Sequence, residues 1–310
     1  MGKNGNKGIS LAELLEKLNN NPDNLGIPGN GFEYQNLTGK QDATKEFFRT
    51  QSFLKKIFLE RIINEAPELV DPNMSLQFIN YGDTQQVYVL TANGKQWSVL
   101  VTQPGTKHGT GKCEFDNLRH LSTINSDVIV KPEYYFEDNG KELYIAPYIY
   151  QARCIASQDH GYGIYVPEPF YRFDTFTPRE REVVNTCMIA NLVRLYDDEK
   201  EQGLGACKIG GGDFILDKSW DTSTKDIDDT LESMKLIAAR EMIPMSFDDY
   251  LQQLLIEFSE RTYYRNIEDR DPNILINHKN RIPMTFGEIG EGIELGKRLR
   301  KVKWGGIYVN

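Results

Sequence analysis

Apolar residues along the chain follow two patterns, one typical of helices and one typical of strands. From Asp42 to about Ile63 they recur every three or four residues, which predicts a helix with one buried face. Four more helices are predicted, over 111–125, 178–205, 228–241 and 246–262. Short runs of β-branched and aromatic residues predict strands; they are SLQFINYG (75–82), QQVYVLTANGKQWSVLVTQ (85–103), VIVKPEYYFED (128–138) and KELYIAPYI (141–149).

Turn and cap residues define where several of these elements begin and end. Asn93-Gly94 predicts a tight hairpin, because both residues readily take positive φ angles. Pro178 predicts the start of a long helix, and Gly203 with Gly205 predicts its end. The segment 10–18 predicts a short capped helix near the N-terminus.

Three regions lack a regular pattern. Residues 1–45 are rich in Asn and Gly and are interpreted as an arm. Residues 151–177 form an irregular aromatic stretch, long for a loop, that predicts an insertion or a lid. Residues 271–301 are read as strand, turn and strand followed by a basic helix.

Charge and composition narrow the classes of function. The 310 residues carry a net charge of −9, which argues against nucleic acid as the main partner. No apolar run is long enough for a membrane span, and the N-terminus lacks the apolar core of a signal peptide, so we expect a cytoplasmic protein. The four cysteines and four histidines show no metal-ligand spacing, which argues against a zinc site or a histidine relay.

The order of elements in residues 75–150 resembles the N-lobe of a protein kinase. NYGDTQQVYVL stands where that family has its glycine-rich loop, GKQWSVLV resembles the third strand, and EFDNLRHLSTI resembles the αC helix. The resemblance implies a two-lobed α+β fold, with an antiparallel sheet and one helix in the N-lobe and a mainly helical C-lobe. It places an arm with helices at 1–70, the N-lobe at 71–150 and the C-lobe at 151–310.

The family's catalytic signature is only partly present in this N-lobe. Of the three loop glycines only Gly82 remains, and with Thr84 it is the expected nucleotide contact. Leu100 replaces the third-strand lysine. Glu114 stands where the family has the glutamate that pairs with this lysine, and it is interpreted either as a site residue or as an ordinary surface acid.

The resemblance also identifies a catalytic segment in ACKIGGGDFILDKSWDTSTKD (206–226). Asp213 takes the position of the metal-binding asparagine, and Lys208, five residues earlier, takes that of the catalytic base. Asp226 follows at the spacing of the D-F-G aspartate. Asp213 and Asp226 are thus expected to hold Mg²⁺ with ATP, while Lys208 either contacts phosphate or is a solvated lysine beside a turn.

A second segment competes for the catalytic-loop position. In EDRDPNILINHKNRIPMTFGEIG (268–290), Asn273 heads the run NILI, Glu268 or Asp269 stands near the base position, and TFG replaces D-F-G with Thr285 in place of the aspartate. About twenty residues follow it, too few for the rest of a C-lobe. It also lies far along the chain from residues 128–149, which resemble the fourth and fifth strands leading into the hinge between the lobes, so the first placement is favoured.

Three classes of function follow. The first is a pseudokinase that serves as a binding or scaffolding module for a protein partner, with weak or absent phosphotransfer. The second is an active ATP-dependent transferase with Mg-ATP held by Asp213 and Asp226. The third is a structural component of a homo-oligomer or larger assembly. The sequence favours the pseudokinase, because the lysine, the glycines and the base are replaced.

Overall fold

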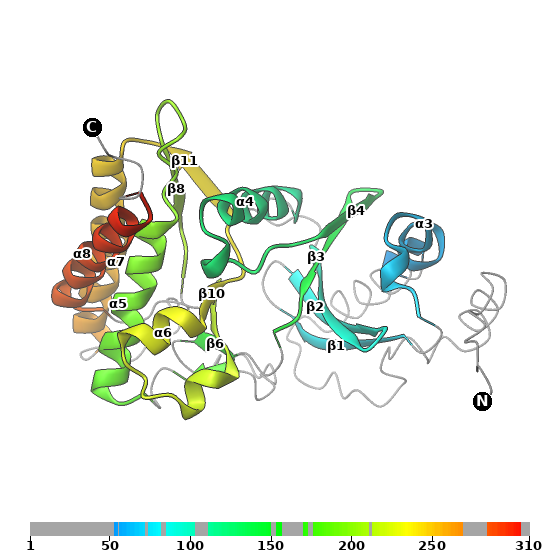
Figure 1. Cartoon of the computed structure of the whole chain (residues 1–310), viewed down its shortest axis with the longest axis horizontal. Coiled ribbons are helices and arrows are strands. Elements are labelled where there is room, and N and C mark those ends of the chain that lie inside the picture. Colours follow the sequence, from blue (N-terminus) through cyan, green and yellow to red (C-terminus); the bar gives the residue numbers. More distant parts are fainter. Residues whose placement is uncertain are drawn as a thin grey trace, which may run out of the picture. The chain divides into compact units, whose positions relative to one another are not determined.

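The computed structural model divides the chain into two units. The first comprises Met1–Thr106 and Glu133–Tyr148, and the second Lys107–Pro132 and Ile149–Asn310 (Figure 1). Each unit is described by itself. The structure describes residues 53–54, 56–71, 74–81, 85–102, 111–149, 153–156, 170–172, 176–210, 213–268 and 284–304.

A five-stranded antiparallel sheet forms the first unit, in the order β1-β2-β3-β5-β4. Buried Trp97, Val99 and Val101 alternate along one strand with more exposed residues, the period-two pattern of a sheet with one face on a core. Asn93 (φ 51°) and Gly94 (φ 72°) form the predicted hairpin turn. The strands are β1 (Ser75–Tyr81), β2 (Gln85–Ala92), β3 (Lys95–Thr102), β4 (Tyr134–Asp138) and β5 (Lys141–Pro147).

A helical segment packs into the same core as this sheet. It includes a π-helical stretch, η2 (Phe58–Ile62), and ends in α3 (Ile63–Glu65) before a single 3₁₀ turn, η3 (Pro67–Leu69). Ile57, Phe58 and Ile62 are buried in one cluster with residues of the strands. The helix predicted for residues 42–63 is confirmed where the structure describes it, and the predicted helix at 10–18 lies outside the described residues.

Helix α4 (Gly111–Ile124) belongs to the second unit by its contacts. Asn117 Nδ2 donates to the Ala239 carbonyl (2.8 Å), and the Cys113 thiol donates to the Arg240 carbonyl (3.5 Å). His120 Nε2 lies 2.8 Å from Asp197 Oδ2. Residues 113, 117 and 120 share one helix face, because they are spaced four and three apart. The helix was predicted within an N-lobe of 71–150, and that domain boundary stays a prediction.

The second unit is organised around α5 (Pro178–Arg194), most of which is buried. Thr177 and Glu180 form a capping box at its start, with Pro178 in the first turn as predicted. Its main partner is α8 (Phe286–Trp304), which lies beside it in Figure 1. A Cβ on Gly292 would stand 2.6 Å from Ile189 Cβ, and one on Gly296 2.6 Å from Val193 Cβ, so only glycine allows this close approach.

The predicted C-terminal end of α5 was wrong. The helix ends at Arg194 rather than near residue 205. Asp197 and Leu204 exchange backbone hydrogen bonds of 3.0 Å, which closes a turn, and Gly203 takes a φ of 71° within it. The chain then enters β8 (Leu204–Cys207), which pairs antiparallel with β11 (Glu241–Pro244).

Small sheets and helices complete this unit. The predicted helix at 228–241 was correct only as far as α6 (Ile227–Ser233), and a strand follows. The helix predicted at 246–262 is confirmed as α7 (Phe247–Glu268). A second sheet has the order β10-β9-β6-β7. Its strands are β6 (Arg153–Ala156), β7 (Phe170–Arg172), β9 (Phe214–Leu216) and β10 (Met234–Leu236), and two 3₁₀ helices are η4 (Ser126–Val128) and η7 (Lys218–Thr222).

The architecture confirms the predicted fold class. An antiparallel sheet is followed by a mainly helical part, with one helix between the third and fourth strands of the chain, as the kinase resemblance implies. The strands β6 and β7 lie within the predicted insertion at 151–177 and pair in parallel. None of the described helices is long and apolar enough to cross a membrane.

Candidate functional site

The segment that resembles a catalytic loop connects β8 to β9. It begins at Lys208, directly after β8, and reaches Asp213, directly before β9. Gly211 and Gly212 lie outside the described residues. The predicted short strand after the loop is present as β9, but a strand, β8, rather than the predicted long helix, directly precedes it. The two strands belong to different small sheets.

Lys208 is exposed and contacts two glutamates, one through its ammonium group and one through its backbone N–H. Its Nζ lies 2.6 Å from Glu241 Oε2 on β11, and its backbone N–H donates to Glu257 Oε2 on α7 (3.2 Å). The hydrogen bond to Glu241 raises the pKa of the Lys208 amine. The residue takes a φ of 56°, which is uncommon for a side chain with a Cβ. At neutral pH Lys208 is therefore charged and cannot accept a proton.

Asp213 is held at the start of β9 by backbone groups. Its Oδ2 accepts a hydrogen bond from the Gly210 N–H (2.6 Å), and its carbonyl accepts one from the Ile237 N–H (2.8 Å). The side chain is half-buried. Asp213 and Gly210 are also joined by a backbone hydrogen bond, from the Asp213 N–H to the Gly210 carbonyl (3.1 Å).

Asp226 is the N-cap of α6. Its Oδ1 accepts the Asp229 N–H (3.0 Å), and its Oδ2 accepts the Thr224 hydroxyl (2.9 Å). The hydrogen bond from the Asp229 backbone N–H, followed by the one from the Thr224 hydroxyl, lowers the pKa of the Asp226 carboxyl. These are the contacts expected of a helix cap.

The contacts of α5 separate Asp226 from Lys208. Lys225 Nζ lies 2.9 Å from Glu180 Oε1 in the first turn of α5. Near the other end of that helix, the Tyr250 hydroxyl lies 3.2 Å from the Leu192 carbonyl and 3.1 Å from the Ala206 carbonyl. Leu192 follows Glu180 by twelve positions along the helix, a rise of about 18 Å. The magnesium role of Asp213 and Asp226 stays a prediction.

Strand pairing identifies a position that the sequence interpretation missed. β9 and β10 form an antiparallel pair, so the residues that follow β10 lie beside Asp213, as the bond from Ile237 shows. Ile237 comes first, followed by Ala238 and Ala239, both buried, and then Arg240. The run MKLIAAR contained the signal, since its apolar residues and small residues predict a buried strand end.

The remaining predicted residues lie apart from this loop in the sequence. Glu114 is buried within α4, at 3% exposure, so the alternative of an ordinary surface acid was wrong. Leu100 lies in β3 and pairs with Val87 and Tyr144. Gly82 and Thr84 lie outside the described residues. Within the part of the chain that the structure describes, no group of three or more His, Cys, Asp or Glu residues could hold a metal ion.

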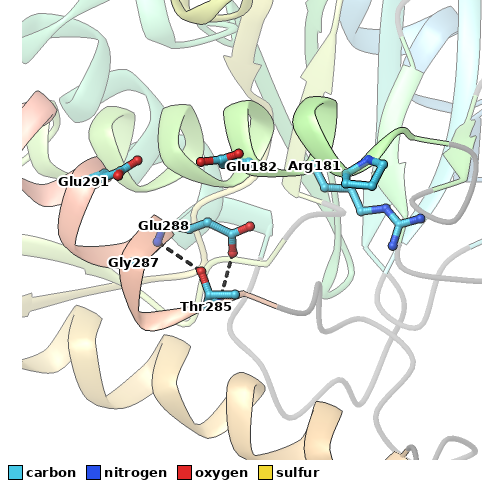
Figure 2. A pocket seen from close by; sticks show the side chains of 7 residues that line it. Arg181, Glu182, Thr285, Gly287, Glu288 and Glu291 are labelled. Atoms are coloured by element: carbon cyan, nitrogen blue, oxygen red, sulfur yellow. Dashed lines mark hydrogen bonds between the residues drawn. The ribbon is translucent and has the colours of Figure 1, made fainter.

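The competing segment ends in a helix start. Thr285 and Glu288 form a reciprocal pair, in which the Thr285 N–H donates to Glu288 Oε2 (2.5 Å) and the Glu288 N–H donates to Thr285 Oγ1 (3.2 Å; Figure 2). The sequence TFGE is therefore a capping box for α8. Asp269 and Asn273 lie outside the described residues.

A small acidic cavity of about 340 Å³ lies beside this helix start. Glu182 of α5 and Glu288 and Glu291 of α8 line it, with Arg181 at its edge (Figure 2). Glu288 is already engaged, because its Oε2 also accepts from Asn185 Nδ2 (3.2 Å). The cavity lies where the first turns of α5 and α8 pack together, and its lining does not identify a ligand.

No protein-family model matches the chain, and no curated protein matches it. Solved structures that resemble it include the kinase domain of BubR1, with 16% sequence identity and a TM-score of 0.36. The alignment covers 64% of this chain and 61% of that chain, so the chain spans about three fifths of the BubR1 domain. A likeness at this level carries no argument about the site. The kinase-like fold rests on the topology of the chain itself.

Proposed function

We propose that the chain is a pseudokinase, a kinase-like protein that has lost phosphoryl transfer and serves as a binding module for a protein partner. The observation that carries this proposal is the ion pair between Lys208 and Glu241. A kinase needs a group at this position that accepts the proton of the substrate hydroxyl. The Lys208 amine is charged, and its pKa is raised by Glu241, so it does not serve as that base.

The residues after β10 support the same proposal. Kinases hold their metal ions with an aspartate that follows the strand hairpin of the catalytic segment. We take the residues that follow β10 as this position, because β10 pairs with β9; Ala238 and Ala239 lie there, and an alanine side chain offers no ligand for Mg²⁺. Loss of both the catalytic base and this metal ligand would remove phosphoryl transfer, while the fold could still bind a protein partner.

Incubation with ATP and Mg²⁺ tests the proposal. The intact mass of the protein, and of an added general kinase substrate, is expected to stay unchanged, while an active kinase run in parallel phosphorylates the same substrate. Thermal unfolding with millimolar ATP and Mg²⁺ reports binding separately, because a ligand that binds only the native state raises the unfolding temperature.

Each outcome separates the proposal from its alternatives. A phosphate adduct on the protein or on the substrate would contradict it. A nucleotide adduct would instead favour an ATP-dependent transferase, and its loss in Asp213→Asn or Asp226→Asn would identify the residues involved. A thermal shift without any adduct agrees with a pseudokinase that retains nucleotide.

A further inference from the structure

A cavity of about 620 Å³ lies in the second unit, away from the catalytic-like loop in the sequence. Its walls come from the end of α4, the end of α5, the turn that follows α5, and α8. The side chains that matter most for its chemistry are charged. They are Asp127, Arg194, Asp197, Glu199, Lys200 and Arg300.

Part of this charge is already paired and forms a fixed wall. Asp197 is buried and accepts hydrogen bonds from His120 Nε2 (2.8 Å) and from the Glu199 N–H (2.9 Å). Arg300 contacts Asp198 and also donates to the Val193 carbonyl (2.9 Å) and the Tyr196 carbonyl (2.6 Å). These groups fix α4 and α8 to the end of α5, so the cavity has a preformed shape.

Arg194 is a half-buried cation on this wall that forms no close ion pair with a described carboxylate, although the charge of Asp127 in the same lining acts on it. Its Nη1 donates to the neutral Asn191 Oδ1 (2.8 Å), and no described carboxylate lies within 4.0 Å of the guanidinium. Burial lowers the pKa of this guanidinium. Asp127 only partly offsets this burial, and a guanidinium can bind a carboxylate through two parallel hydrogen bonds. The cavity is thus complementary to one anionic group at Arg194.

The other side chains of the cavity limit what carries that anionic group. Asp127 and Glu199 line the same space, and neither makes an ion pair with the described residues, so they disfavour a polyanion such as a nucleoside triphosphate. They suit a cationic group on the ligand instead. Ile124 and Leu299 add an apolar part to the lining. A zwitterion with an apolar part carries one group for each of these three features.

We propose that this cavity binds a small zwitterion of the kind represented by a free amino acid. Its carboxylate is held by Arg194, its ammonium group faces Asp127 or Glu199, and its side chain contacts Ile124 and Leu299. The proposal does not depend on the pseudokinase function, because the residues that line the cavity lie outside the loop from Lys208 to Asp213.

Thermal unfolding of the full chain with single amino acids tests the proposal. The probes are millimolar glycine, leucine, glutamate and lysine, with acetate, methylammonium and ATP at the same concentrations as controls. At least one amino acid is expected to raise the unfolding temperature more than acetate and methylammonium do together, since neither control carries both charges. If no amino acid does so, the proposal is wrong.

Three variants locate the binding. Arg194→Gln is expected to weaken binding by about tenfold or more, because it removes a charge-assisted hydrogen bond. Arg298→Gln removes an exposed arginine of α8 that does not line the cavity, and binding should not change. Leu299→Trp reduces the cavity without changing its charge and should also abolish binding, so it decides the question if Arg194→Gln does not fold. Binding that survives both Arg194→Gln and Leu299→Trp contradicts the proposal, as does an ATP shift that Arg194→Gln removes.

Discussion

The α5–α8 interface and the loop from Lys208 to Asp213 belong to the same unit, yet different forces hold them. The interface depends on close contact, because Gly292 and Gly296 let α8 approach the side chains of α5. The loop depends on an exposed ion pair and on backbone hydrogen bonds. From this comparison we expect added side-chain volume at the interface to destabilise the unit. We expect a change of charge in the loop to have little effect on the free energy of unfolding.

The largest effect is expected from Gly296→Ala. The new Cβ would stand 2.6 Å from Val193 Cβ and 2.9 Å from the Ala190 carbonyl oxygen, and backbone cannot move aside as a flexible side chain can. Overpacking of this kind lowers the free energy of unfolding by about 1–3 kcal/mol. Urea denaturation followed by circular dichroism measures the difference.

Gly290→Ala is the matched control on the same helix. A Cβ at Gly290 meets nothing within 4 Å, and alanine favours the helix interior by about 1 kcal/mol over glycine. This variant should therefore be more stable than the unaltered chain. If Gly290→Ala loses as much stability as Gly296→Ala, close packing at Gly296 does not explain the Gly296 result.

An intermediate effect is expected at the start of α6, where Asp226→Ala removes the N-cap. The native pKa of Asp226 is lowered, so its contribution to stability is present above the unfolded-state pKa and is lost as the pH falls through the folded-state pKa. Asp226→Asn keeps a capping oxygen and should abolish this pH dependence. Urea midpoints at neutral and acidic pH test it; an identical acid response in both variants and in the unaltered chain would exclude the capping role.

The smallest effect is expected from Lys208→Gly. The substitution removes an exposed ion pair but relieves a positive φ angle, and the two changes oppose each other. Because Glu241 raises the pKa of Lys208, the ion pair is present at neutral pH and is lost as the pH rises through the folded-state pKa. Thermal unfolding at neutral and strongly alkaline pH should therefore differ less for Lys208→Gly than for the unaltered chain. A large loss at neutral pH would show that the loop supports the fold.

Local signals allowed much of the fold to be predicted. The hairpin at Asn93-Gly94 and the start of α5 at Pro178 depend on residues within a few positions of each other. Alternating burial in β3 likewise follows from its sequence. These features need no knowledge of what the element packs against.

Non-local pairing explains what could not be predicted. β8 pairs with β11, more than thirty residues later, and this pairing ends the α5 region in a turn and strand although its sequence looks helical. The position of Asp226 was inferred from spacing along the chain. Only the pairing of β9 with β10 shows which residues lie after β10, and this partner strand comes after η7 and α6 in the sequence.

The attachment of α4 has a consequence for how the chain can be divided. Its partners Ala239, Arg240 and Asp197 all come from the later part of the sequence, whereas β1–β3 precede it and β4 and β5 follow it. A chain cut at residue 150 would leave α4 on the fragment that lacks these partners. Neither unit is a continuous piece of polypeptide. If residues 1–150 and 151–310 were produced separately, α4 would form its native contacts only after the two fragments associated.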